Sequence, residues 1–302
     1  MITLIFRGFL KVAELSLFIL IDIYDIIRER KVLFMGKVIK KYEELEFTDD
    51  FMFCMIMANN PKLCKELLEL ILGIKIKKVE LADNQKSVNI TYDGKGVRFD
   101  VYVNDTENTV YDIEMQTTKQ KDLPKRTRYY QGMIDLNLIE KGMKYSKLKK
   151  SFVIFICLED IFGKNLPVYT FTNICEQDHS IRLGDEATKV IVNASGSRDG
   201  LSEDMCSFLD FLIKKEATSE FTQEIQNAVD NAIAKKEWEV QYMTMLMKIQ
   251  QEREDAEIYR LIKSYKTFNA SDEKIIEDLS KEFDLTREEA EEALSNYEAD
   301  NQ

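Results

Sequence analysis

The stretch VRFDVYVNDTENTVYDIEMQ (Val97–Gln116) is the part of the sequence that decides the fold. Two runs of alternating apolar and polar residues flank NDTENT, a segment rich in the turn formers Asn and Asp. This pattern predicts a β-hairpin whose strands pair through Val103 and Tyr111. The apolar residues of both strands then share one face, and we expect that face to pack against the core.

The opposite face of the predicted hairpin carries polar side chains. The register pairs them as Arg98 with Gln116, Asp100 with Glu114, and Tyr102 with Asp112. Directly opposite residues have Cβ atoms about 4.5–5.5 Å apart, and two carboxylates that close destabilise each other unless one is protonated or a cation binds between them. A solvated strand face, with Arg98 neutralising one acid, is an alternative explanation. Asp112 is either a spare ligand or a partner for Tyr102.

The facing acids Asp100 and Glu114 suit a divalent metal ion. Mg²⁺ takes oxygen ligands, typically one or two carboxylates together with waters and substrate phosphate. Such a metal polarises a phosphate oxygen, lowers the pKa of bound water and stabilises charge in the transition state. The arrangement of the two acids suits a metal-assisted phosphodiester hydrolase.

The charge distribution points to the same substrate class. The net charge of the 302 residues is −12, but residues 201–302 carry 25 acidic and 12 basic residues and account for all of it. Residues 117–150 contain ten Lys/Arg against three acidic residues. A basic cluster of this kind is typical of a surface that binds a phosphate backbone, although a solvated lysine-rich helix has the same composition.

Other residue counts exclude several kinds of site. The five cysteines are widely spaced without a CxxC pair, so the sequence supports neither a zinc site nor a disulfide framework, and we expect a reduced, cytoplasmic compartment. A lone histidine, His179, excludes a histidine-rich metal site within one chain and is more typical of a solvated loop than of a catalytic triad. No GxxxxGK[ST] or GxGxxG motif occurs, so we expect no nucleotide cofactor.

The N-terminus is apolar from Phe9 to Ile27, but four charged residues interrupt this stretch. Each charge at the centre of a spanning helix costs about 2.5–3.5 kcal/mol on insertion scales, so a membrane span is not expected. Met35 begins a segment that has the character of a natural start. We therefore expect residues 1–36 to be an extension outside the fold, with a membrane-associated helix as the alternative.

The remaining chain predicts a mixed α/β protein with a helical C-terminal extension. Residues 48–72 favour helix broken at Pro61, and residues 123–139 have helical periodicity. Strands are expected, beside the hairpin, at 74–81, 86–92, 151–158, 168–174 and 188–194. We divide the chain into a core over residues 37–200, long helices over 201–266 that pack on this core, and a small acidic helical tail over 267–302.

Five motifs, in order, resemble the PD-(D/E)XK phosphodiesterase superfamily, in its branch of nuclease family transposases and recombination-promoting nucleases. They are TDDFMF (48–53), RFD (98–100), IEMQ (113–116), RTRYY (126–130) and EWEVQYMTM (237–245). The resemblance covers about Lys40 to Lys263. It implies a restriction-endonuclease-like αβββαβ core and a Mg²⁺- or Mn²⁺-dependent DNA endonuclease of a mobile-element or recombination system.

The resemblance also assigns roles to individual residues. Asp100 matches the first acid of the superfamily and Glu114 the second, as catalytic residues and metal ligands. Gln116 stands where the superfamily usually places a lysine, and a neutral amide can orient a water but cannot support a hydroxide electrostatically. Arg126 is a candidate for the missing positive charge, with Arg128 as the lesser candidate.

Further residues complete the predicted site. Asp50 resembles the acid on the first helix that completes such sites, and a helix N-cap is its alternative role. Contacts with DNA are expected from Arg126, Arg128, Tyr130, Lys119 and Lys125.

Two other functions remain open from the sequence. If Gln116 marks a loss of catalytic activity, the same fold would serve as a DNA-binding or regulatory module. The acidic helices over 219–298 could alternatively form a homodimer or shield the basic cluster.

Overall fold

The computed structural model describes residues 40–81 and 100–301, together with the backbone of four two-residue strands at 33–34, 37–38, 87–88 and 97–98. The apolar stretch Phe9–Ile27 and the suggested start at Met35 lie outside the described residues. Contacts divide the chain into two compact units, Met1–Ala234 and Lys235–Gln302.

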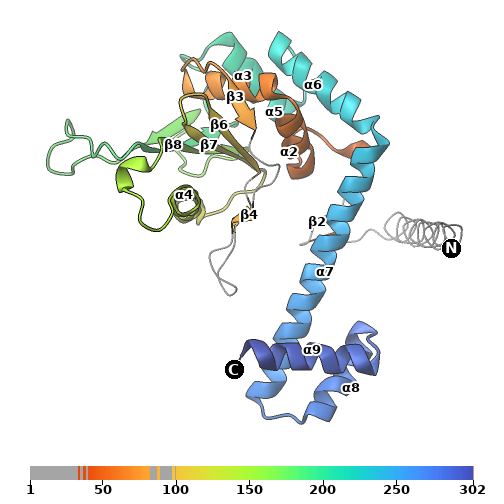
Figure 1. The fold of residues 1–302 in the computed structure, drawn as a ribbon. Coiled ribbons are helices and arrows are strands. Elements are labelled where there is room, and N and C mark those ends of the chain that lie inside the picture. Colours follow the sequence, from red (N-terminus) through yellow and green to blue (C-terminus); the bar gives the residue numbers. More distant parts are fainter. Residues whose placement is uncertain are drawn as a thin grey trace, which may run out of the picture. The chain divides into compact units, whose positions relative to one another are not determined.

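The first unit is built on a six-stranded mixed sheet in the order β3-β6-β7-β8-β10-β9 (Figure 1). Its strands are β3 (Val79–Leu81), β6 (Val101–Asp105), β7 (Val110–Gln116), β8 (Ser151–Cys157), β9 (Val168–Phe171) and β10 (Ala187–Asn193). Strands β7, β8 and β10 run parallel, and the other neighbouring pairs are antiparallel. The predicted mixed α/β class is confirmed.

The predicted hairpin register is confirmed over its centre, where Val103 pairs with Tyr111 and Tyr102 with Asp112. The expectation of one continuous first strand is wrong. Strand β6 begins at Val101, and Asp100 forms a bend before it. Arg98 lies in the separate two-residue strand β5 (Val97–Arg98), which pairs with β4 (Ser87–Val88), so it pairs with Ser87 instead of Gln116.

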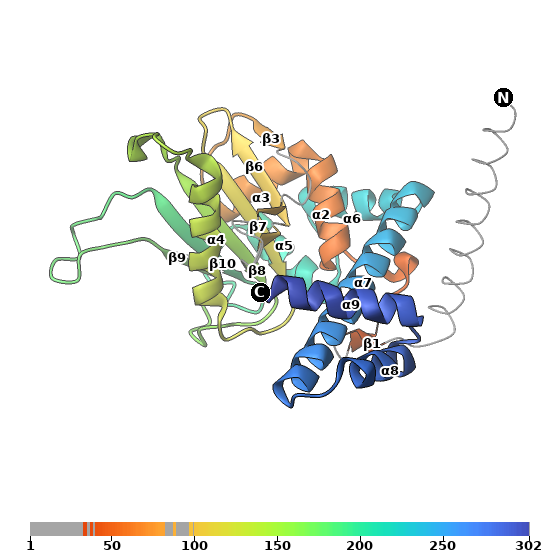
Figure 2. The same cartoon turned by 60° about the horizontal axis from the view of Figure 1, so that its bottom comes forward.

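Helices cover both faces of the sheet (Figure 2). Helix α4 (Leu123–Leu138) packs on one face, and α2 (Asp50–Asn59), α3 (Pro61–Leu72) and α5 (Glu203–Lys214) lie on the other. Helix α6 (Glu220–Ile233) packs against α2. Two short 3₁₀ helices, η1 (Tyr42–Glu44) and η2 (Tyr145–Lys147), complete the unit, with the paired strands β1 (Leu33–Phe34) and β2 (Lys37–Val38).

The break between α2 and α3 falls at Asn60, directly before Pro61. Proline lacks the N–H group that a continuing helix needs but suits the first position of a new one. The predicted break is therefore confirmed.

The second unit consists of α7 (Lys236–Thr267), α8 (Asp272–Phe283) and α9 (Arg287–Asp300). The hydroxyls of Ser271 and Thr286 cap α8 and α9 by accepting hydrogen bonds from the third-position backbone N–H groups. A small core joins the three helices through Ile262, Ile275, Leu279, Ala290 and Leu294.

Candidate active site

The polar face of β7 is buried under α4. Asp112 is 0%, Glu114 1% and Gln116 7% exposed. Apolar residues of α4 and the sheet surround them, including Tyr130, Ile134 and Phe155. The explanation of this face as a solvated strand surface is therefore wrong, because strand β7 packs on both faces and a helix covers its acids.

Asp100 and Glu114 contact each other as the register predicted, although Asp100 lies just outside the strand. The backbone N–H of Asp100 donates to Oε1 of Glu114 at 2.9 Å. The backbone N–H of Met115 donates to Oδ2 of Asp100 at 3.2 Å. Each carboxylate thus binds backbone of the opposite segment, and these two bonds take the place of ladder bonds at the end of β6.

Arg126 supplies the positive charge of this cluster. Its Nη2 donates to Oε2 of Glu114 at 2.9 Å, and its Nη1 donates to Oε1 of Gln116 at 3.0 Å. The hydroxyl of Tyr130 accepts from Nη2 at 2.7 Å and from Nε at 3.1 Å, and the ring of Phe155 lies 5.1 Å below the guanidinium carbon. The guanidinium is held from several sides, so its position on Glu114 and Gln116 is well defined.

The side-chain amide of Gln116 is held by hydrogen bonds at both of its polar atoms. Its Nε2 donates to the backbone oxygen of Thr118 at 2.8 Å and lies 3.2 Å from the Thr118 hydroxyl. Its Oε1 accepts from Arg126. The amide therefore positions the arginine, and Arg126 of α4 brings a cation into contact with the position where the superfamily usually has a lysine.

Burial raises the pKa values of all three acids, and repulsion between carboxylates adds to the rise at Asp100 and Asp112. Burial raises the pKa of Glu114 to about 6, against the opposing effects of the Asp100 N–H and Arg126. Burial, then repulsion from Glu114 and Asp50, raises the pKa of Asp100 well above its ordinary value. Burial, then repulsion from Glu114 and Asp100, does the same for Asp112. One guanidinium thus offsets only part of the charge of three neighbouring carboxyls.

Asp112 is the residue whose role the sequence left open. Both of its oxygens are buried, and no group in the described part of the chain donates a hydrogen bond to either of them. The protonated carboxyl of Asp112 can itself donate to Glu114. A buried charge without partners costs several kcal/mol, so the neutral carboxylic acid is the form that this environment favours. The alternation of strand side chains placed Asp112 beside Glu114, but only the packing of α4 shows that it is sealed from solvent.

The remaining predicted residues fall into two groups. Asp50 begins α2, is exposed, and lies close enough to repel Asp100 electrostatically. The predicted side-chain cap at this helix is absent within the described residues, since Asp49 is the N-cap residue and its carboxylate accepts from Glu46 and Lys40 instead. Three predicted DNA contacts are exposed: Lys119, Lys125 and Arg128.

The residues present fit one divalent cation better than a larger metal cluster. Across residues 40–81 and 100–301, no group of three or more His, Cys, Asp or Glu side chains converges in a way that could hold a metal. Asp100 and Glu114 can supply two carboxylates, and each retains lone pairs beyond the hydrogen bonds described above. This donor set matches a Mg²⁺ that completes its shell with waters and substrate phosphate.

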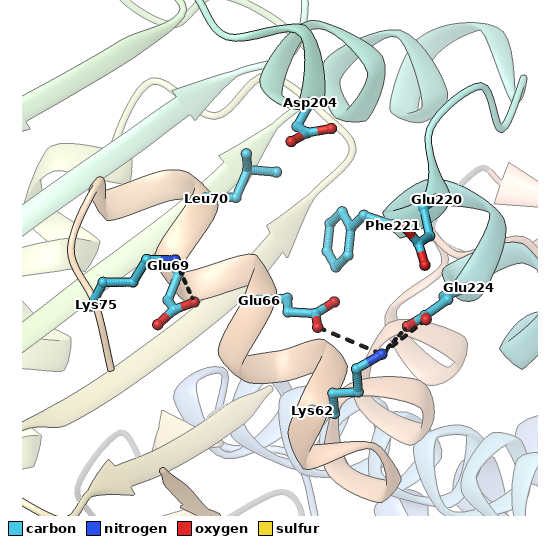
Figure 3. A pocket seen from close by; sticks show the side chains of 9 residues that line it. All are labelled: Lys62, Glu66, Glu69, Leu70, Lys75, Asp204, Glu220, Phe221 and Glu224. Atoms are coloured by element: carbon cyan, nitrogen blue, oxygen red, sulfur yellow. Dashed lines mark hydrogen bonds and ion pairs between the residues drawn. The ribbon is translucent and has the colours of Figure 1, made fainter. Parts of the chain in front are cut away.

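A separate pocket lies between α3, α5 and α6 (Figure 3). It has a volume of about 410 Å³, and Lys62 at its edge is paired with Glu66 and Glu224. Its charged lining residues are Lys62, Glu66, Glu69, Lys75, Asp204, Glu220 and Glu224. Carboxylates outnumber ammonium groups there, so this pocket is unsuited to a phosphate backbone.

Other observations bear on the remaining expectations. All five cysteines are free, and burial raises the pKa of Cys64 and of Cys157 to about 12. In the part of the chain that the structure describes, no helix combines the length and the apolar character needed to cross a membrane.

The comparisons with known proteins add one finding. No curated protein and no solved structure matches the chain. A sequence model of the family described as PD-(D/E)XK nuclease family transposase matches residues 47–194. This range contains the whole six-stranded sheet, helices α2 to α4, and the cluster of Asp100, Glu114, Gln116 and Arg126. Over residues 47–194 the chain therefore belongs to the PD-(D/E)XK nuclease family transposases.

Proposed function

We propose that the protein is a metal-dependent DNA endonuclease that hydrolyses phosphodiester bonds for a mobile-element or recombination system. The contact between Asp100 and Glu114 carries this proposal, because it brings two carboxylates together at the end of the hairpin. Membership of a nuclease family supports the reaction class. The exposed lysines and arginines after β7 support DNA as the substrate.

The residues of the site have separate roles in this proposal. Asp100 and Glu114 would hold Mg²⁺ or Mn²⁺, and Asp50 is the nearest further acid. When bound, the ion would polarise the scissile phosphate and make a bound water more acidic. Arg126 orients Glu114 and Gln116, and it places positive charge beside the position where negative charge develops. Tyr130 fixes the guanidinium through its hydroxyl.

The test is cleavage of supercoiled plasmid by the full chain with Mg²⁺ or Mn²⁺. Asp100→Asn keeps the size of the side chain but removes a carboxylate, and we expect it to abolish nicking while the fold persists. Asp122→Asn, at an exposed carboxylate before α4, is the matched control and should cut like the wild type. Equal cleavage by wild type and Asp100→Asn would overturn the proposal.

A catalytically inactive DNA-binding module is the second candidate, and the ion pair of Arg126 with Glu114 favours it. An arginine that already neutralises Glu114 competes with a metal ion for the same carboxylate. This candidate predicts salt-dependent DNA binding without cleavage in Mg²⁺ or Mn²⁺. Calorimetric titration with Mn²⁺ separates the two candidates. If the protein is a nuclease, the wild type should bind Mn²⁺ and the Asp100→Asn variant should not. The inactive module needs no metal ion.

Two further proposals concern the setting of the protein. A reduced, cytoplasmic compartment agrees with five free cysteines. Self-association through helices α7–α9 is a prediction that sedimentation of the full chain at several concentrations would test.

A further inference from the structure

A long connection joins β9 to β10 and projects from the sheet (Figure 1, Figure 2). We call it the arm, residues 172–186. Its two sides pair at Ile174 and Arg182. The backbone N–H groups of Cys175 and Leu183 donate to carbonyl oxygens of the opposite side at 2.9 and 3.0 Å. The arm is therefore a two-stranded ribbon and not an irregular loop.

The base of the arm bends sharply. Gly184 and Glu186 have φ angles of 74° and 55°, and a positive φ is uncommon for a residue with a side chain. Across the base, the amide of Asn173 donates to the carboxylate of Asp185 at 2.6 Å. The bend at which the arm leaves the sheet is thus part of the local backbone geometry.

One face of the arm is apolar and exposed. Because side chains alternate along a strand, Ile181 and Leu183 point to the same face, and Cys175 lies opposite Ile181. Ile181 is 54% exposed and Leu183 69% exposed. An isolated two-stranded ribbon is only marginally stable in water, and clustered exposed apolar side chains are typical of interaction sites. The arm therefore has the character of a docking element.

The charge of the arm defines the kind of partner. The arm contains four acidic residues and one arginine. Arg182 donates to the hydroxyl of Thr172, and the exposed side chains of Glu176 and Glu186 carry negative charge. Such a surface repels a phosphate backbone and attracts a basic protein surface. The arm thus fits a protein surface that combines lysines with apolar side chains.

This chain contains a surface of that kind in residues 140–150, which we call the basic segment. It holds five lysines and one glutamate, and its Met143 and Tyr145 are exposed, Tyr145 by 84%. Of the ten Lys/Arg in residues 117–150, Arg126 is the one that forms an ion pair with another described residue. The lysines of the basic segment are therefore available to acids of another molecule.

The arm and the basic segment meet the sheet side by side. Strands β8 and β10 are parallel neighbours, and their first residues, Ser151 and Ala187, pair with each other. The backbone N–H of Ser151 donates to the oxygen of Glu186 at 3.0 Å. The last residue of the arm therefore lies beside the end of the basic segment, at one end of the sheet.

We propose that two copies of the chain associate by docking the arm of each copy on the basic segment of the other. Because both elements lie at the same end of the sheet, a two-fold axis at this end forms both contacts at once. Pairing arm with arm would instead bring like charges together. This dimer is independent of the proposed reaction and uses no part of α7–α9.

Sedimentation equilibrium of the full chain, without nucleic acid or divalent metal, measures the dissociation constant of the dimer. The arm variant is Glu176→Lys with Glu186→Lys, and the segment variant is Lys144→Glu with Lys147→Glu. Each places like charges in contact, so we expect the dissociation constant to rise on the order of tenfold or more. The variant with all four changes restores opposite charges and should recover most of the wild-type affinity, which also shows that the altered chains fold.

A second pair of variants tests the apolar face. Ile181→Ser with Leu183→Ser removes two apolar side chains from the arm, and we expect dimerisation to weaken on the order of tenfold or more. The matched control is Ile74→Ser with Ile213→Ser, which removes two exposed apolar side chains elsewhere in the first unit and should dimerise like the wild type.

Three results would overturn the inference. They are a wild type that stays monomeric at its highest soluble concentration, equal losses in the apolar variant and its control, and a four-change variant that dimerises no better than the arm and segment variants. A wild-type dimer that all of these changes leave intact would also overturn it, since the interface would then lie elsewhere.

Discussion

The guanidinium of Arg126 lies on the carboxylate of Glu114, with Nη2 2.9 Å from Oε2, and the same guanidinium reaches Gln116 through Nη1. The side chain of Glu114 is 1% exposed and that of Arg126 32% exposed. Helix α4 therefore brings a cation to a strand that carries acids and an amide, and this contact links the helix to the chemistry of the hairpin.

Replacing Arg126 by glutamine should destabilise the fold and abolish cleavage. Removing one partner of a fully buried ion pair costs about 3–5 kcal/mol, and the partial exposure of the arginine reduces this to about 1–3 kcal/mol. Urea unfolding at pH 7.5 measures the loss. Arg128→Gln, on the exposed face of the same helix, is the control and should unfold like the wild type. If the Arg126→Gln variant cleaved DNA as fast as the wild type, the guanidinium would not serve the reaction.

Restoring the superfamily's lysine at position 116 should not improve the enzyme. An ammonium group there would meet Nη1 of Arg126, which now donates to Gln116 Oε1 at 3.0 Å, and like charges at this distance repel. We expect Gln116→Lys to lower both the unfolding midpoint and cleavage. The double variant Gln116→Lys, Arg126→Gln should recover part of both, as a double-mutant cycle measures. A single Gln116→Lys variant more active than wild type would contradict this account.

The metal-free protein should be more stable in mild acid than at neutral pH. A carboxyl whose pKa is raised on folding contributes stability below its ordinary pKa, and this contribution is lost as pH rises through the raised value. For Glu114 the window runs from 4.5 to about 6, and the shift corresponds to about 2 kcal/mol. Carboxyls whose pKa is lowered on folding, such as those of Glu69 and Asp210, change the free energy of unfolding only at pH values below this window.

Unfolding by urea at intervals between pH 4.5 and 8 checks this expectation. The Glu114→Gln variant is the reference, because it lacks the titrating group and should show a flatter profile. A wild-type profile that rises through pH 6 would contradict the direction of the shift.

Asp112→Asn should stabilise the protein at pH 8 and have little effect at pH 5. At pH 8 the buried carboxyl of Asp112 either stays protonated or carries a destabilising charge, whereas the amide is neutral at pH 5 and at pH 8. The expected gain at pH 8 is on the order of 1–3 kcal/mol, as for other buried charges without partners. The difference between the unfolding free energies at the two pH values is the quantity to measure. A loss of stability at pH 8 would show that the ionised carboxylate has a partner that favours it.

Gly132→Ala should raise the unfolding free energy by roughly 0.5–1 kcal/mol, because the position is exposed and helical and the new methyl group meets nothing. Thermal unfolding of the two proteins measures this gain. A Gly132→Ala variant less stable than the wild type would contradict it.

The sequence by itself determined the hairpin and its register. Strand alternation and the turn residues between Val103 and Tyr111 fix which side chains share a face, and both are local properties of the chain. The same alternation paired Asp100 with Glu114. Pro61 likewise set a helix boundary through its missing N–H group. Such features follow from a few neighbouring residues and need no knowledge of the rest of the fold.

Only the tertiary structure decided what covers the polar face. A row of acids on a strand is compatible with solvent, with a metal or with a helix, and the choice depends on where α4 packs. That packing buries Asp112 and places Arg126 against Glu114, which lies 12 residues earlier in the sequence. It also divides the lysines of segment 117–150 between the two ends of a helix. The parallel pairing of β7 with β8 and the packing of α4 on this sheet set these contacts, and no local pattern encodes them.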